Sequence, residues 1–202
     1  MDQAMPSDKY PKPHPLTKIE DYSEGLRTLL GQGDKSHFNI VIAIENGLGL
    51  KLPEFSLVVR SQEKLGPIEA FTEFTPLRMI VRQDIYEAAY RDDFRSRFTL
   101  AHELGHLCLH WGHPAPKLAP SAQKFKDSPR NARIEMEANQ FAGAFLMPRT
   151  VACRFDDPRL LASLCRVSEV AASRRLNELW VQGADFTTKS VRALFGVNGQ
   201  KK

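Results

Sequence analysis

Apolar residues recur three or four positions apart in several stretches of the chain, the spacing that places them on one face of a helix. One stretch covers about 18–30, where Thr17 and Glu20 have the spacing of a capping box, and it predicts a short amphipathic helix. A second helical stretch, at 38–45, is predicted to end at Asn46-Gly47.

The pattern then changes to short runs that are rich in β-branched and aromatic residues. These runs are 55–60, 68–74 and 77–81, and turns that contain glycine or proline separate them. Short strands joined by such turns are typical of one sheet. The sequence therefore predicts a small antiparallel sheet in this region.

The second half of the chain is predicted to be mainly helical. Asp92-Asp93 offers N-caps to a helix that ends near Trp111, before a glycine and a proline. Ser128-Pro129 is a second start signal, with proline at the first helical position, and the helix that follows is predicted to end at Leu146.

A chain of 202 residues with 42% hydrophobic and 26% charged residues can form one sizeable core and a smaller helical module. Together with the predicted elements, this composition indicates an α+β fold of helices around a small antiparallel sheet. We divide the chain into an N-terminal arm with a short helix at 1–36, a core at 37–150 and a C-terminal segment at 151–202.

Nothing in the pattern indicates export or membrane insertion. No stretch approaches the roughly 20 uncharged apolar residues of a membrane helix, and the N-terminus has no apolar signal region. The three cysteines, Cys108, Cys153 and Cys165, are odd in number and irregularly spaced, which argues against a disulfide framework. We therefore expect a cytoplasmic protein with no membrane partner.

The formal net charge of +4 is unevenly distributed along the chain. Residues 1–100 carry −2 and residues 101–202 carry +6, of which +5 lies on the last 55 residues. A nucleic-acid-binding surface would be sought in this basic segment. The alternative is that the charge only keeps the protein soluble.

An H-E-x-x-H motif, His102-Glu103-Leu104-Gly105-His106, lies within the helix predicted after Asp92-Asp93. Imidazoles four residues apart lie on one helix face, about 6 Å apart along the axis, so both can bind one metal ion. Glu103 is rotated away from that face and can accept a proton from a water that attacks a peptide carbonyl. The motif predicts His102 and His106 as metal ligands and Glu103 as the general base of a metallopeptidase.

A catalytic zinc site usually has a third protein ligand. His110 lies about 12 Å beyond His102 along the helix axis, too far to share a metal with it, so we expect it to have a supporting or structural role. His113 does not fit the extended metzincin motif, because Gly112 stands where the third histidine of that motif would be.

The next predicted helix offers two glutamates as the third ligand. At about 100° per residue, Glu135 lies about 60° from the centre of the apolar stripe and Glu137 about 100° from it, so Glu135 is expected to be the more inward. Asn139 is one turn beyond Glu135 on the same face and can hydrogen-bond a ligating imidazole. We expect Glu135 to complete the ligand set of His102 and His106; the alternative is a surface charge.

Two blocks of the sequence resemble the ImmA/IrrE family of metallopeptidases. One is 97–106, with the H-E-x-x-H motif, and the other is 135–142, which reads E-x-x-A-N-x-F-A and precedes Leu146-Met147-Pro148. The resemblance covers about 38–180 and implies a zincin-like core, Glu135 as the third metal ligand, and zinc as cofactor, with manganese as the alternative. It also implies an endopeptidase that cleaves a helix-turn-helix repressor and relieves repression in stress responses, mobile-element induction or toxin–antitoxin-like pairs.

The basic C-terminal segment is similar to a helix-turn-helix, with one helix at 159–165 and another after Ser168. A DNA-reading helix normally projects polar side chains from its first turn, whereas this helix begins with Glu169 and then three small or apolar residues. We expect the segment at 159–180 to pack on the core or to dock the repressor, with DNA contact as the alternative.

The sequence thus predicts a metal-dependent endopeptidase that acts on a transcriptional repressor. One alternative is a metal-containing regulatory protein that binds the repressor or DNA without proteolysis. A further alternative is a metal-stabilised scaffold without turnover.

Overall fold

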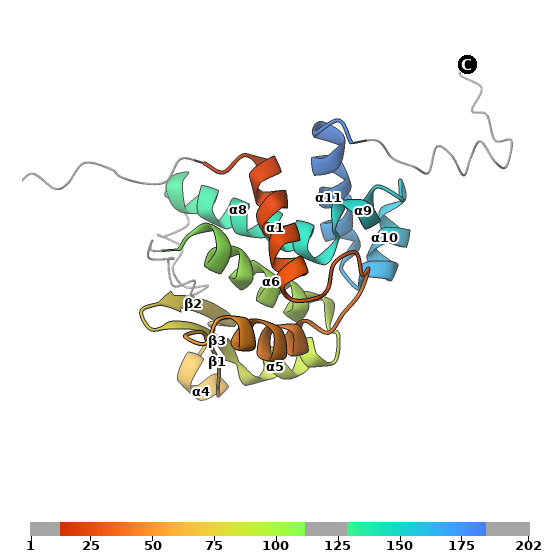
Figure 1. The fold of residues 1–202 in the computed structure, drawn as a ribbon. Coiled ribbons are helices and arrows are strands. Elements are labelled where there is room, and N and C mark those ends of the chain that lie inside the picture. Colours follow the sequence, from red (N-terminus) through yellow and green to blue (C-terminus); the bar gives the residue numbers. More distant parts are fainter. Residues whose placement is uncertain (1–12, 112–128, 185–202) are drawn as a thin grey trace, which may run out of the picture.

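Helix α6 (Phe94–Leu109) lies in the middle of the fold, between a small sheet and a layer formed by α8 (Pro129–Leu146) and α1 (Leu16–Leu29) (Figure 1). The computed structural model describes residues 13–111 and 129–184. Within this part of the chain the fold is α+β and mostly helical. The central position of α6 matters because this helix carries the H-E-x-x-H motif.

Two helix starts in the second half of the chain are confirmed by their caps. Asp93 accepts a hydrogen bond from the backbone N–H of Ser96 at 2.8 Å. The hydroxyl of Ser168 accepts one from the backbone N–H of Ala171 at 3.2 Å. Ser128, also predicted as a cap, lies outside the described residues.

The N-terminal helical region differs from the prediction. Helix α1 begins at Leu16 without a side-chain cap, so Thr17 lies inside its first turn and the predicted capping box is wrong. The second helical stretch does not end at Gly47 but continues through it. A Cβ at this position would lie 2.7 Å from Cδ2 of Leu30, so the glycine permits close packing and does not end the helix. This stretch comprises α2 (Ile40–Ile42), a π-helical turn η1 (Ala43–Leu48) and α3 (Gly49–Lys51).

The sheet contains three strands, β1 (Ser56–Arg60), β2 (Ala70–Phe74) and β3 (Leu77–Arg82), in the order β1-β3-β2. Strands β2 and β3 are antiparallel, as expected for strands joined by a tight turn. Strand β1 is parallel to β3, so the prediction of a fully antiparallel sheet is wrong. The mostly buried β3 occupies the centre, and the chain passes from β1 to the far edge strand through α4 (Gln62–Leu65).

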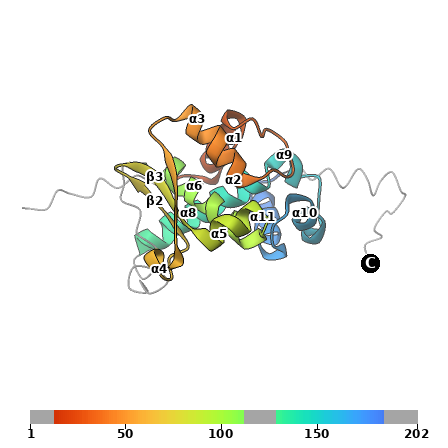
Figure 2. The same cartoon turned by 90° about the horizontal axis from the view of Figure 1, so that it is seen from below.

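Helix α5 (Gln83–Tyr90) and three C-terminal helices complete the described part of the fold, and the C-terminal helices lie together on the side away from the sheet (Figure 2). Helix α5, which was not predicted, follows β3 directly and packs against α6 through its buried residues Ile85 and Ala89. Among the described residues, no helix is long and apolar enough to cross a membrane. The C-terminal helices are α9 (Arg149–Ala152), α10 (Pro158–Cys165) and α11 (Glu169–Val181).

Buried arginines tie the C-terminal helices to the rest of the structure. Arg97 on α6 donates to the backbone carbonyls of Cys165 at 3.1 Å and Arg166 at 2.7 Å, in the turn between α10 and α11. Arg175 on α11 forms a buried ion pair with Glu20 on α1. Because a buried charge needs a partner, these contacts fix α10 and α11 against the core.

Candidate metal centre

His102 and His106 project from the same face of α6 towards α8. Their Nε2 atoms lie 3.0 Å apart, and both side chains are mostly buried. The i,i+4 spacing predicted this geometry, because residues four apart lie one above the other on a helix. The two imidazoles therefore present one ring nitrogen each to a common point.

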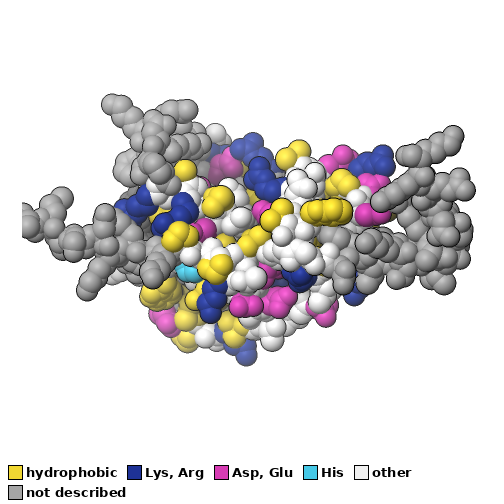
Figure 3. All heavy atoms as spheres, turned by 90° about the horizontal axis from the view of Figure 1, so that it is seen from above, with side chains coloured by type: hydrophobic (Ala, Val, Ile, Leu, Met, Phe, Trp, Pro, Cys, Tyr) yellow, Lys and Arg dark blue, Asp and Glu magenta, His cyan; other side chains and the backbone are white. Residues whose placement is uncertain are grey.

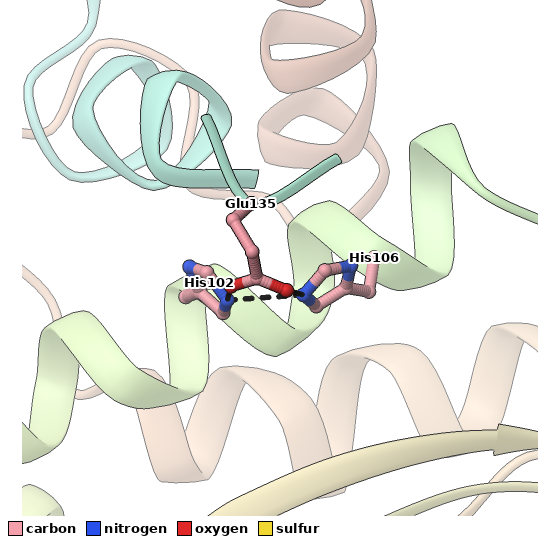
Figure 4. Close-up of side chains that lie close together, drawn as sticks. All are labelled: His102, His106 and Glu135. Atoms are coloured by element: carbon pink, nitrogen blue, oxygen red, sulfur yellow. Dashed lines mark hydrogen bonds and ion pairs between the residues drawn. The ribbon is translucent and has the colours of Figure 1, made fainter. Parts of the chain in front are cut away.

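Glu135 on α8 completes this group (Figure 4). Its Oε2 lies 3.2 Å from Nε2 of His102, and its Oε1 lies 3.5 Å from Nε2 of His106. One ligand atom from each of the three residues lies within 4.8 Å of the others. Among the described residues, this is the group of histidine, cysteine and acidic side chains that is arranged to hold a metal ion.

The prediction that Glu135 lies further inward than Glu137 is wrong. Glu137 is the more buried of the two, with a side chain 3% exposed against 20% for Glu135. Glu137 is turned to the other flank of α8, where it contacts His110 and His14. The angle around the helix did not predict the burial of Glu137, because it takes no account of polar residues from other segments, such as His14 and His110, that pack over that side of α8.

The three side chains fit a divalent metal ion. Ligand atoms about 2.0–2.2 Å from a tetrahedral centre are roughly 3.3–3.6 Å apart, close to the observed 3.0 Å between the two Nε2 atoms and the 3.2 and 3.5 Å from these atoms to Oε2 and Oε1 of Glu135. Oε1 of Glu135 is buried and has no hydrogen-bond partner, as expected of an atom that binds something other than the protein. Two imidazoles and a carboxylate are also a donor set that zinc and manganese accept.

Asn139, one turn beyond Glu135, contacts the far side of His102. Its Oδ1 lies 3.0 Å from Nδ1 of His102, so an N–H at Nδ1 donates to the amide oxygen. This hydrogen bond leaves the lone pair of the imidazole on Nε2, the atom that faces His106 and Glu135.

Glu103 is buried beside the two histidines, and a residue that sequence reasoning missed contacts it. Thr72 on β2 donates from its hydroxyl to Oε2 of Glu103 at 3.0 Å. Burial raises the pKa of Glu103, although the charge of His102 and the bond from Thr72 act against this shift. A carboxylate with a raised pKa is suited to accept a proton near neutral pH.

The two histidines differ in their affinity for protons. Burial lowers the pKa of His102, but the hydrogen bond that His102 donates to Glu135 and the charges of Glu103 and Glu135 outweigh burial, so the net shift is upward. Burial and the neighbouring His102 and His110 hold the pKa of His106 well below its ordinary value. The cluster thus joins two carboxylates to one imidazole that favours a proton and one that resists it, and a divalent cation would balance the carboxylates.

The sequence singled out two further histidines, His110 and His113, besides those of the metal group. His110 is buried next to His106, with the two Nδ1 atoms 3.1 Å apart, a contact that the i,i+4 spacing of these histidines could have predicted. His113 lies outside the described residues.

A protein family and a solved structure are similar to this chain. Residues 56–177 match the family model of the IrrE N-terminal-like domain. Among solved structures, a Mycobacterium tuberculosis transcriptional regulator has a similar fold, with a TM-score of 0.50 and 18% sequence identity. The similarity covers 81% of this chain and 52% of that chain, so this chain spans about half the length of that protein. No curated protein matches the sequence.

Proposed function

Since the family model matches more than half of its length, the chain belongs to the ImmA/IrrE family of metallopeptidases, and we propose that it is an endopeptidase that cleaves a helix-turn-helix transcriptional repressor. The observation that carries this proposal is the convergence of His102, His106 and Glu135 beside the buried carboxylate of Glu103. Cleavage of the repressor would relieve repression, in a stress response or in the control of a mobile element or toxin–antitoxin pair. The reaction would take place in the cytoplasm.

The proposed roles follow from the positions of the side chains. His102, His106 and Glu135 hold the metal ion, for which we propose Zn²⁺ with Mn²⁺ as the alternative. Asn139 holds His102 in the tautomer that leaves Nε2 free to bind the metal. When bound, the ion supplies a Lewis acid that polarises the scissile carbonyl and makes water acidic enough to lose a proton near neutral pH.

Glu103 carries out the proton transfers of the reaction. Its carboxylate accepts a proton from the attacking water while the water oxygen bonds to the carbonyl carbon. Glu103 then donates this proton to the amide nitrogen, and the C–N bond breaks to give a carboxylic acid and an amine. Thr72 holds Oε2 of Glu103, so Oε1 is the atom left free to meet the water.

Helices α10 and α11 are our proposed docking surface for the repressor, in preference to a DNA-binding surface. Large apolar side chains are exposed near the end of α11, with Trp180 74% and Val181 83% exposed. At its start, Val170 lines a hollow of about 580 Å³ with Phe94 and Phe98 of α6. Apolar exposed surface of this kind favours contact with a protein, whereas DNA is contacted mainly by basic and polar side chains.

The test is cleavage of a helix-turn-helix regulator, with Zn²⁺ or Mn²⁺ added; a regulator encoded by a neighbouring gene is the first choice of substrate. Wild-type protein should cut the regulator, and Glu103→Gln should bind the metal but cut at least about 1,000-fold more slowly, because the amide cannot accept the proton. Glu63→Gln, at an exposed site on α4, is the matched control and should cut like wild type.

Failure of the wild type to cut the regulator, or equal cutting by Glu103→Gln, would overturn the proposal. A DNA mobility shift that is sensitive to salt and unchanged in Glu103→Gln would favour a regulatory protein without proteolysis.

A further inference from the structure

A chain of buried polar groups leads away from His106 on the side opposite the metal group. Nδ1 of His106 lies 3.1 Å from Nδ1 of His110, and Nε2 of His110 lies 3.3 Å from Oε2 of Glu137. All three side chains are buried. The proposed function assigns no role to His110 or Glu137.

The positions of the hydrogens in this chain follow from the atom that binds the metal. A neutral imidazole that binds through Nε2 carries its proton on Nδ1, so Nδ1 of His106 is a donor. Nδ1 of His110 must then accept, and the proton of His110 is on Nε2. That N–H faces the carboxylate of Glu137, which accepts it.

The carboxylate at the end of the chain is itself held in place. The backbone N–H of His14 donates to Oε1 of Glu137 at 3.3 Å, and Nδ1 of His14 lies 2.9 Å from Oε2. The guanidinium of Arg133, one turn earlier on α8, has its Nε 3.5 Å from Oε1. A carboxylate buried to this extent requires such partners, so Glu137 is a fixed acceptor.

We propose that His110 and Glu137 are positioning residues that fix the tautomer and ring orientation of His106 as a metal ligand. Each of the two ligating imidazoles then has its own partner on its second nitrogen, Asn139 for His102 and His110 for His106. Helix α8 thereby supplies one metal ligand, Glu135, the partner of His102, Asn139, and the carboxylate that orients His110, Glu137. This inference rests on the proposed metal site.

The first measurement is the affinity of the full-length protein for Zn²⁺, by competition with a chelator. His110→Phe keeps a ring of similar size but cannot accept from His106, and it should bind Zn²⁺ about 10–100-fold more weakly. Glu137→Gln keeps an oxygen that can accept from His110, and the loss should be smaller than for His110→Phe. Glu63→Gln, at an exposed site on α4, is the control and should bind within about 3-fold of wild type.

The second measurement does not depend on whether a variant folds. In wild-type protein labelled with ¹⁵N-histidine and loaded with Zn²⁺, long-range ¹H–¹⁵N correlations report which ring nitrogen carries a proton. We expect His106 to be protonated on Nδ1 and His110 on Nε2 only. His110 protonated on Nδ1, or on both nitrogens, would contradict the inference.

The two proposals fail in different ways. If the wild type binds no Zn²⁺ or Mn²⁺ at the histidines, the proposed metal site is wrong and the inference falls with it. If the wild type binds Zn²⁺ and His110→Phe binds it equally well, only the positioning role is wrong.

Discussion

Gly105 on α6 lies directly against the backbone of Ala138 on α8. A Cβ on Gly105 would lie 3.0 Å from both Cα and the carbonyl oxygen of Ala138, so only glycine fits here without a shift of the helices. Gly105 directly precedes His106 in the chain, and Ala138 lies three residues after Glu135. The close approach of α6 and α8 brings Glu135 within reach of both imidazoles (Figure 4).

Gly105→Ala should therefore weaken both stability and metal binding. Overpacking a tight helix contact typically costs about 1–3 kcal/mol of unfolding free energy, despite the better helix propensity of alanine. Gly143→Ala on α8 is the matched control, because its Cβ would meet only Cδ of Arg175 at 3.9 Å. Urea unfolding and Zn²⁺ competition measure the two effects, and equal behaviour of both variants would contradict the expectation.

Removal of the metal should lower the melting temperature, and Glu135 should be needed for this effect. A ligand at about 1,000 times its Kd stabilises the folded state by about 4 kcal/mol, which is roughly 10 °C for a chain of this size. Chelation should reverse the shift in wild type. Glu135→Gln should lose most of the shift, whereas the exposed Glu63→Gln should keep it; a full shift in Glu135→Gln would exclude this residue as a ligand.

Thr72 should support catalysis without supporting metal binding. Thr72→Val removes the hydroxyl that donates to Glu103 but keeps the shape of the side chain, and we expect kcat to fall about 10-fold with Zn²⁺ affinity unchanged. Thr72→Ser keeps the donor and should restore most of kcat. If serine and valine have the same effect, the hydrogen bond is not the cause.

Glu178 should make the stability of the protein depend on pH. Burial raises its pKa from 4.5 to about 7; Arg175 and Arg174 oppose this shift, and Glu20 adds to it. Between these pH values the folded protein keeps a proton that the unfolded chain releases, so the unfolding free energy falls as pH rises through this window and levels off above it.

Glu178→Gln should remove this contribution and be about 1–2 kcal/mol more stable than wild type at pH 8, after an allowance for the partial exposure of the side chain. Urea unfolding from pH 4.5 to 8 measures the difference. Glu169→Gln, at an exposed position on the same helix, should follow the wild-type curve. A constant difference between Glu178→Gln and wild type over this range would contradict the expectation.

The distribution of surface charge favours a protein over DNA as the partner of the C-terminal segment. Figure 3 shows apolar, basic and acidic side chains interspersed on one face of the molecule, without a large surface of a single charge. The net charge of the last 55 residues is +5, but Arg175 is buried in its ion pair with Glu20, which lies outside this segment. The sequence count therefore overstates the charge that a nucleic acid would meet on the described helices.

Features that depend on neighbouring residues were predictable from the sequence. The caps at Asp93 and Ser168 and the common face of His102 and His106 all involve residues within one or two helical turns, where backbone geometry is nearly constant. The spacing of these residues is therefore enough to place them. Glu135 was also predicted to lie beside the two histidines, as it does in the structure, although the resemblance to the family carried more of that inference than the helical angle did.

Contacts between distant segments were decided by the tertiary structure. The parallel pairing of β1 with β3, the bond from Thr72 to Glu103 and the contact of His110 with Glu137 each join parts of the chain that are about 20 to 30 residues apart. Such contacts depend on how helices and strands pack, and packing depends on the volumes and polar partners of many side chains at once. The H-E-x-x-H motif was thus readable along the chain, whereas the residues that contact it became visible only when α6, α8 and β2 were brought together.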